Sequence, residues 1–110
     1  SNYGVFLMSR KLIDLVDVIR SKNAGPYRLT FDIILKNDSD YKKLKKEKVI
    51  NKGLISSLYQ IRESDIISII YYDPARAVKF TIRRPLIAGD IGERDVYGAQ
   101  QYAPLFSILI

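Results

Sequence analysis

Two short runs of this sequence alternate between apolar and polar side chains with a period of two residues. The first run has its apolar side chains at Leu29, Phe31, Ile33 and Leu35. The second has them at Val78, Phe80 and Ile82. Successive side chains of a β-strand point to opposite faces of a sheet, so both runs predict strands with one buried face. Such strands need a second layer packed on that face, which restricts the fold to a sheet covered on one side or a sandwich.

The segments outside these runs predict helices as the covering layer. Residues 10–20 follow a possible N-cap, Ser9, and have apolar side chains at helical spacing: Leu12, Leu15, Val16 and Ile19. A second helix is predicted after Asp38-Ser39, with a buried stripe of Tyr41, Leu44 and Val49. A third is predicted after Asn51, with an inward face of Leu54, Ile55, Leu58 and Tyr59.

Two more strands complete the predicted sheet. Residues 66–72 are rich in β-branched residues and have apolar side chains at both odd and even positions, which favours a central strand covered on both faces. Asp73-Pro74-Ala75-Arg76 predicts a tight turn, and residues 105–110 predict a last strand. The helical crossover between residues 35 and 66 predicts that the first two strands are parallel. We therefore expect an α+β fold with a mixed four-stranded sheet, helices mainly on one face and a ferredoxin-like arrangement.

The length of 110 residues predicts one domain, over residues 9–110. Residues 1–8 are expected to be a tag or leader segment, because Ser1-Asn2 resembles a tag remnant and Met8 is the only methionine. The chain has no Cys and no His, which excludes disulfides, cysteine nucleophiles, Ser-His-Asp triads and imidazole metal ligands. We predict no metal site and no cofactor. The lack of cysteine and of a signal sequence favours a cytoplasmic protein.

The net charge of +6 is concentrated in one segment, residues 36–52, where seven lysines face three acids. A phosphate-backbone contact for nucleic acid is one interpretation of this cluster. The other is a solvated helix face, which we favour because aromatic and arginine side chains are almost absent there. The strand after the turn adds Lys79, Thr81 and Arg83, which with Thr30 and Asp32 would form an outer face open to solvent or to a partner.

Two polar segments are candidate binding sites. Lys22, Asn23 and Gly25 lie in a predicted helix end and turn, which could also hold a carboxylate or phosphate. The second segment contains Tyr97, Gln100 and Gln101 and does not match the residue pattern of a known turn. A buried glutamine amide there would have to form hydrogen bonds with the backbone or with a ligand. We expect the two segments to line one shared site, with Asp73 as a weaker member. No catalytic residue can be assigned.

The segments 20–26 (RSKNAGP) and 95–104 (DVYGAQQYAP) resemble the signatures of a small family of domains of unknown function. Tyr72-Asp73-Pro74-Ala75 and Arg84-Pro85 are also similar to it. The family is associated with the acyclic terpene utilisation protein AtuA. Its members usually carry His where this chain has Tyr102, so no role as a base or ligand is carried over to that side chain.

The resemblance implies a ferredoxin-like fold and an AtuA-type partner, in the breakdown of branched acyl-CoA or related carbon sources. It implies no reaction. The leading hypothesis is an accessory subunit that binds the larger AtuA-type protein. The alternative is a self-sufficient small enzyme or binding protein for an anionic carboxylate or CoA-type molecule, and nucleic-acid binding ranks third. An apolar last strand also favours self-association.

Overall fold

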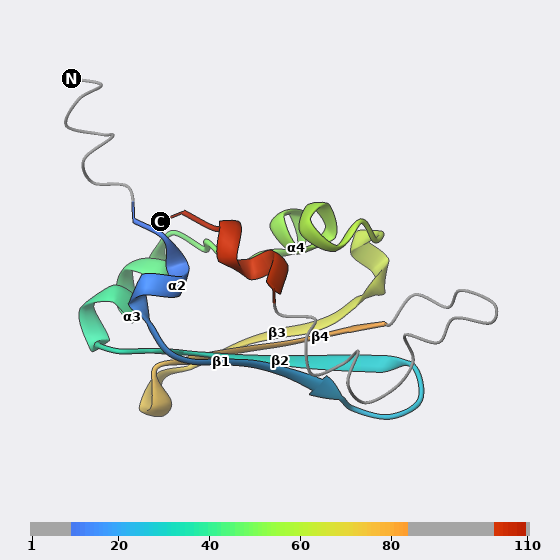
Figure 1. The fold of residues 1–110 in the computed structure, drawn as a ribbon, viewed down its shortest axis with the longest axis horizontal. Helices are drawn as coiled ribbons and strands as arrows, with labels where there is room; N and C mark the ends of the chain where they lie inside the picture. The colour runs from blue at the N-terminus through green and yellow to red at the C-terminus, as the bar shows by residue number, and fades with distance from the viewer. Residues whose placement is uncertain (1–9, 84–102, 110) are drawn as a thin grey trace, which may run out of the picture.

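The computed structural model describes residues 10–83 and 103–109, and shows a four-stranded antiparallel sheet with its helices on one face (Figure 1). The predicted leader, residues 1–8, and the expected N-cap Ser9 lie outside these ranges. The strands are β1 (Val16–Asn23), β2 (Arg28–Leu35), β3 (Ile66–Tyr72) and β4 (Ala77–Arg83). The helices are α2 (Leu12–Leu15), α3 (Asp38–Lys46) and α4 (Lys52–Tyr59). Short 3-10 turns form η1 (Glu63–Asp65), η2 (Asp73–Ala75) and η4 (Ala103–Ser107).

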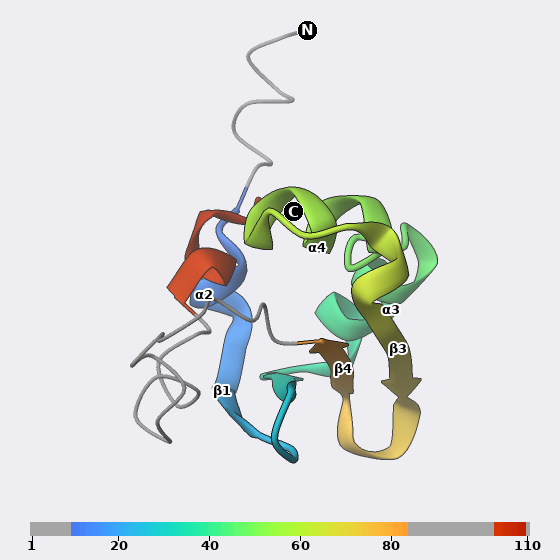
Figure 2. The same ribbon diagram turned by 90° about the vertical axis from the view of Figure 1, so that its right-hand side faces the viewer.

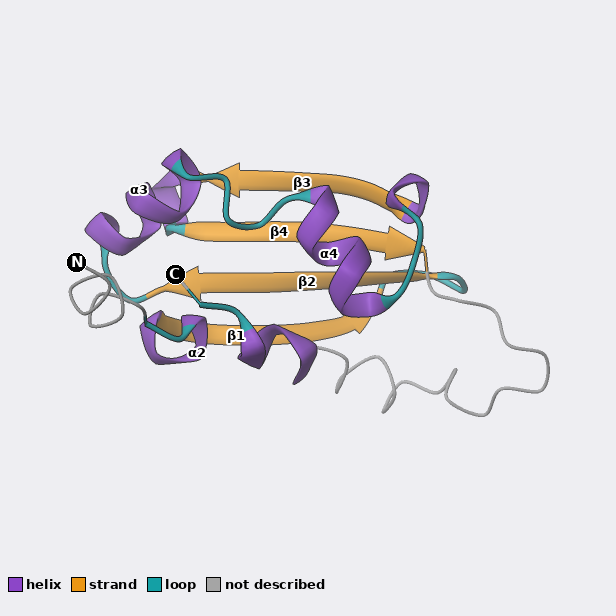
Figure 3. Ribbon diagram, turned by 90° about the horizontal axis from the view of Figure 1, so that it is seen from above, coloured by secondary structure: helices purple, strands orange, loops and turns teal. Residues whose placement is uncertain are grey.

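The sheet has the strand order β1-β2-β4-β3, as Figure 3 shows from above. The α+β class is confirmed, but every neighbouring pair is antiparallel and the prediction of a mixed sheet is wrong. β2 and β3 do run in the same direction. However, the tight turn returns β4 into the space between them, so each pairs with β4 and not with the other. This strand order does not confirm the expected ferredoxin-like topology.

The N-terminal helix predicted over residues 10–20 is wrong. Only Leu12–Leu15 is helical, and the chain then continues as β1, which pairs with β2 from Val16↔Leu35 to Asn23↔Leu29. The β-branched residues in this stretch fit a strand, and pairing gives the backbone of β2 a partner along its outer edge. The spacing of the apolar residues is compatible with a helix, but pairing with β2 determines the structure of this segment.

The C-terminal strand predicted over residues 105–110 is also wrong. The chain forms η4, and Leu109 makes only an isolated bridge with Lys11. Leu105 and Ile108 are buried, and the carbonyl of Ile108 accepts a hydrogen bond from the Leu12 amide at 2.9 Å. This segment contributes to the helical layer rather than to the sheet.

The core lies between the sheet and the helices (Figure 2). Phe31 and Phe80 stack with ring centroids 4.4 Å apart, and Tyr59 of α4 packs against Phe31 at 5.2 Å.

Asn51 caps α4 as predicted, accepting from the Leu54 amide at 2.9 Å, whereas α3 begins one residue early, with Asn37 as its cap. Within residues 10–83 and 103–109, the helices cover only the side of the sheet that carries Phe31 and Phe80. The prediction that residues 66–72 are covered on both faces is wrong: Ile67, Ile70 and Tyr72 are exposed.

Candidate functional site

The register of the four strands gathers alternate side chains on the face of the sheet that no helix of the described residues covers, which we call the open face. Cross-strand partners share a face, so the pairs Arg20↔Asp32 and Asp32↔Lys79 define one row across three strands. Ile70↔Lys79 extends this row to β3. By the same alternation the open face consists of Val18, Arg20, Lys22, Arg28, Thr30, Asp32, Ile34, Ser68, Ile70, Tyr72, Ala77, Lys79, Thr81 and Arg83.

The open face is basic. Five of its side chains are cationic and one is acidic: Arg20, Lys22, Arg28, Lys79, Arg83 and Asp32. At the end of the sheet, Asp65 of η1 also approaches Arg83, at 3.8 Å. In the sequence, most of the excess charge falls in residues 36–52. Folding creates a second basic region, because charges that are scattered in sequence alternate along three strands and meet on one side.

Asp32 is the polar centre of the open face. Although it lies on the uncovered side, Asp32 is only 8% exposed, because β2 is a central strand and its neighbours flank it. Its carboxylate accepts from Arg20 Nε at 3.2 Å and lies 3.9 Å from Lys79 Nζ. The hydroxyls of Thr30 and Thr81 are hydrogen-bonded to each other at 3.2 Å. These contacts order the middle of the surface before any partner binds.

A hollow of about 380 Å³ lies beside Asp32 on the open face. Arg20, Asp32 and Lys79 form its polar side, and its apolar side consists of Ile34, Ile70, Tyr72 and Ala77. Ile70 is 51% exposed and Tyr72 is 56% exposed. Apolar and aromatic groups surrounded by fixed charges are typical of a surface that docks a partner, since the apolar part supplies affinity and the charges supply orientation.

The predicted site residues do not all meet. Lys22 lies on the open face opposite Thr30, and Asn23 follows it at the end of β1 on the helix-bearing side. Gly25 lies in the β1–β2 hairpin with φ +114°, the positive value expected for this turn. Residues 24–28 of the hairpin line a hollow of about 330 Å³. Tyr97, Gln100 and Gln101 lie outside the described residues, so the expected meeting of the two segments stays a prediction.

Asp73 belongs to the other end of the sheet, and its expected grouping with Lys22 is not seen. Tyr72 pairs with Ala77, which lies opposite Ile34, whereas Lys22 lies opposite Thr30. Ile34 and Thr30 are four residues apart along β2, so Tyr72 and Lys22 lie in rows separated by roughly 13 Å of extended strand. Figure 1 shows η2 and the β1–β2 hairpin at opposite ends.

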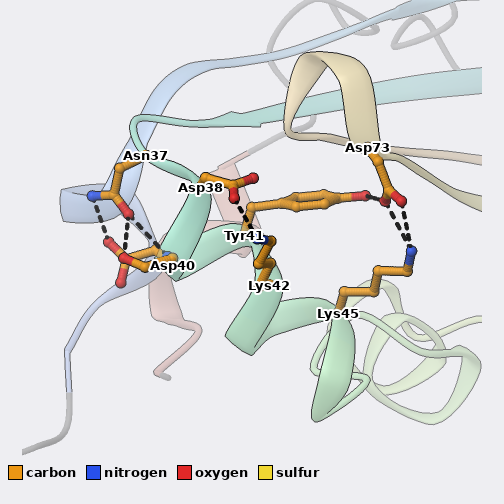
Figure 4. A network of polar contacts seen from close by, with 8 residues as sticks. Asn37, Asp38, Asp40, Tyr41, Lys42, Lys45 and Asp73 are labelled. Atoms are coloured by element: carbon orange, nitrogen blue, oxygen red, sulfur yellow. Dashed lines mark hydrogen bonds and ion pairs between the residues drawn. The ribbon is translucent and has the colours of Figure 1, made fainter.

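Asp73 instead holds α3 against the β3–β4 turn (Figure 4). Its carboxylate accepts from the Tyr41 hydroxyl at 2.6 Å and from Lys45 Nζ at 2.8 Å. These two hydrogen bonds, that of Lys45 first, hold the pKa of Asp73 below its ordinary value. Burial and then the hydrogen bond to Asp73 raise the pKa of Tyr41. A phenol held in this way serves as a donor, and the arrangement is a structural clamp.

The lysine cluster of α3 is largely a solvated helix face, as favoured from the sequence. Lys42 pairs with Asp38 at 2.8 Å, one helical turn away, while Tyr41 and Leu44 are buried on the opposite side.

Over the parts of the chain that the structure describes, no cluster of three acidic side chains could hold a metal ion. Within those same parts, no helix is long and apolar enough to cross a membrane.

The sequence analysis missed several residues of the open face, among them Arg20, Ile70 and Tyr72. Arg20 was missed because its segment fitted a helical spacing, and Ile70 and Tyr72 because their strand was expected to be covered on both sides. Ser68 could have shown which side of this strand faces solvent. It alternates with Ile70 and Tyr72 on the same side, and a polar residue there indicates a side that is not buried.

Comparison with known proteins gives one match. A family model described as domain of unknown function DUF4387 matches residues 12–109. No curated protein and no solved structure matches the chain.

Proposed function

The chain belongs to the DUF4387 family of domains of unknown function, and on this premise we propose that it is an accessory subunit that docks its open face on a larger AtuA-type protein. The family model itself names no partner. The choice of an AtuA-type protein rests on the resemblance of residues 20–26 and 95–104 to a family associated with AtuA, in the breakdown of branched acyl-CoA or related compounds.

The observation that carries the proposal is the apolar group Ile34, Ile70 and Tyr72 beside the charged row of Arg20, Asp32 and Lys79. An apolar patch of this kind gains free energy when a partner removes it from water. Because cations outnumber acids five to one on this face, the partner surface must combine an apolar patch with acidic side chains beside it. A second copy of this chain would place two basic faces together, which disfavours self-association through this surface.

Co-expression with an AtuA-like protein tests the proposal. We expect the two proteins to co-purify, and expect Tyr72→Ala and Lys22→Glu each to weaken binding by about tenfold or more, the scale of a central interface contact. Both side chains are exposed in the free chain, so neither change should unfold it. Lys46→Glu is the matched control, because Lys46 is an equally exposed lysine on α3, away from the open face.

Two well-behaved proteins that never co-purify would contradict the proposed partner. Binding that Lys46→Glu weakens as much as Lys22→Glu does would instead show that the open face is not the docking surface.

A second function is favoured by the hollow itself. Arg20 and Lys79 stand at the edge of an apolar floor, an arrangement that suits a small carboxylate or acyl-CoA with an apolar tail. Thermal-shift measurements with carboxylates and acyl-CoAs test it. A shift that is lost in Lys79→Gln, and kept in Lys46→Gln, would support a ligand site, and the absence of any shift would contradict it.

A further inference from the structure

A second hollow, of about 400 Å³, lies on the other side of the sheet, at its β3 edge. It opens between the end of α3, the connection from α3 to α4, and β3. Ile50, Ile69 and Tyr71 form its apolar floor. Tyr71 pairs with the buried Val78, so this hollow is on the helix-bearing side and is separate from the open face.

Among the described residues that line this hollow, three are lysines and none is a carboxylate. They are Lys45, Lys48 and Lys52, from the end of α3, the connection and the start of α4. Asp73 is the acid bonded to this group, and it engages Lys45 together with Tyr41. Among the residues that the structure describes, Lys48 and Lys52 form no ion pair. Two positive charges therefore converge on the hollow without compensation.

The backbone that carries these lysines is held in place. Asn51 accepts from the Leu54 amide at 2.9 Å and donates to the Lys48 carbonyl at 2.7 Å, which ties the connection to the start of α4. The hydroxyl of Tyr71 donates to the Ile50 carbonyl at 2.8 Å, which ties the connection to β3. The two lysine side chains thus leave from anchored positions four residues apart in the sequence, and only their flexible stems must order when an anion binds.

We infer that this hollow binds the phosphate group of a small phosphorylated molecule. Lysine ammonium groups bind phosphate as point charges, and two uncompensated ammonium groups match a dianion better than a single carboxylate. The apolar floor can contact the organic part of the molecule. A nucleic-acid chain is a poorer match, because the three lysines line a single hollow and its floor offers one aromatic ring, Tyr71, that is bonded to backbone.

Titration of the purified chain, followed by amide NMR shifts at constant ionic strength, tests the inference. The probes are inorganic phosphate and phenyl phosphate. We expect saturable shifts at residues 48–53 with both, and about tenfold tighter binding of phenyl phosphate because its ring reaches the apolar floor. In Lys48→Gln/Lys52→Gln we expect affinity to fall by about tenfold or more, because hydrogen bonds to charged groups are lost.

Lys46→Gln is the matched control, and its affinity should equal that of the unchanged chain. Shifts that never saturate, or that persist undiminished in Lys48→Gln/Lys52→Gln, would overturn the inference. Equal affinity for the two probes would overturn the part assigned to the apolar floor. Lys22→Glu should leave phosphate binding unchanged, so the result is independent of whether the open face docks a partner.

Discussion

The two faces of this sheet are made by the same four strands and differ in almost every physical respect. On the helix-bearing face, Phe31 and Phe80 are fully buried and stacked, and helices, turns and connections complete the layer. On the open face, most side chains are charged or carry a hydroxyl group, and the apolar side chain of Ile70 is exposed. The first face contributes most of the free energy of folding, because it removes apolar surface from water. The second is free to serve a partner, since little of the fold depends on its side chains.

The largest expected difference between the faces is in stability. Phe80→Ala should lower the free energy of unfolding by about 3–5 kcal/mol, because it leaves a cavity beside Phe31 and Tyr59. Ile70→Ala, on the open face, should cost less than about 1 kcal/mol, because the side chain is already half exposed. Chemical denaturation of the two variants measures this, and equal losses would show that the open face is covered in solution.

Asp32 is the exception on the open face, and a smaller effect is expected there. Asp32→Asn should lower the free energy of unfolding by about 0.5–1 kcal/mol, because it removes the charge that faces Arg20 and Lys79, both more than half exposed. The loss should shrink as salt is added. Denaturation at low and high salt measures it, and a loss that salt leaves unchanged would mean that packing, not charge, keeps Asp32 in place.

The smallest expected effect is the pH dependence of the clamp at Asp73. The folded state holds the pKa of this carboxyl below its unfolded value, because Lys45 and Tyr41 hydrogen-bond to the ionised form. The resulting stability is present above the unfolded pKa, about pH 4, and is lost as the pH falls through the lower, folded pKa. Asp73→Asn should therefore make the acid side of the stability curve shallower below about pH 4.

Denaturation curves between pH 2 and pH 7 measure this, with Asp38→Asn on α3 as a control that leaves the hydrogen bonds of Asp73 to Tyr41 and Lys45 intact. Curves of unchanged slope for Asp73→Asn would show that the clamp does not act on the folding equilibrium.

The elements that could be predicted from the sequence are those whose pattern has a single interpretation. The alternation of residues 29–35 and 78–82 fits only a strand with one buried face, and both strands are present. Asn51 caps α4 because its short side chain can reach a free amide two or three residues on, which is a local property. Lys22 was predicted in a helix end and turn but lies in β1 on the open face, and its role in a site stays a prediction.

The elements that could not be predicted are those for which two patterns compete. Residues 12–19 have apolar side chains at a spacing that fits a helix, yet Val16–Asn23 forms a strand because β2 offers an unpaired edge. Leu105 and Ile108 are apolar enough for a strand, yet they pack in the helical layer. In both cases the local free-energy difference is small, and contacts with distant parts of the chain determine the outcome.

By itself, the sequence determined the composition of this protein, the absence of His and Cys, and the two alternating strands that require a covering layer, because these depend on residue identity and near neighbours alone. Only the tertiary structure decided which strands are adjacent, and therefore which charges meet. Arg20, Asp32 and Lys79 lie on three different strands, and no local pattern relates them. They form one surface because hydrogen bonding between strands sets a register, and a register is a property of the whole sheet.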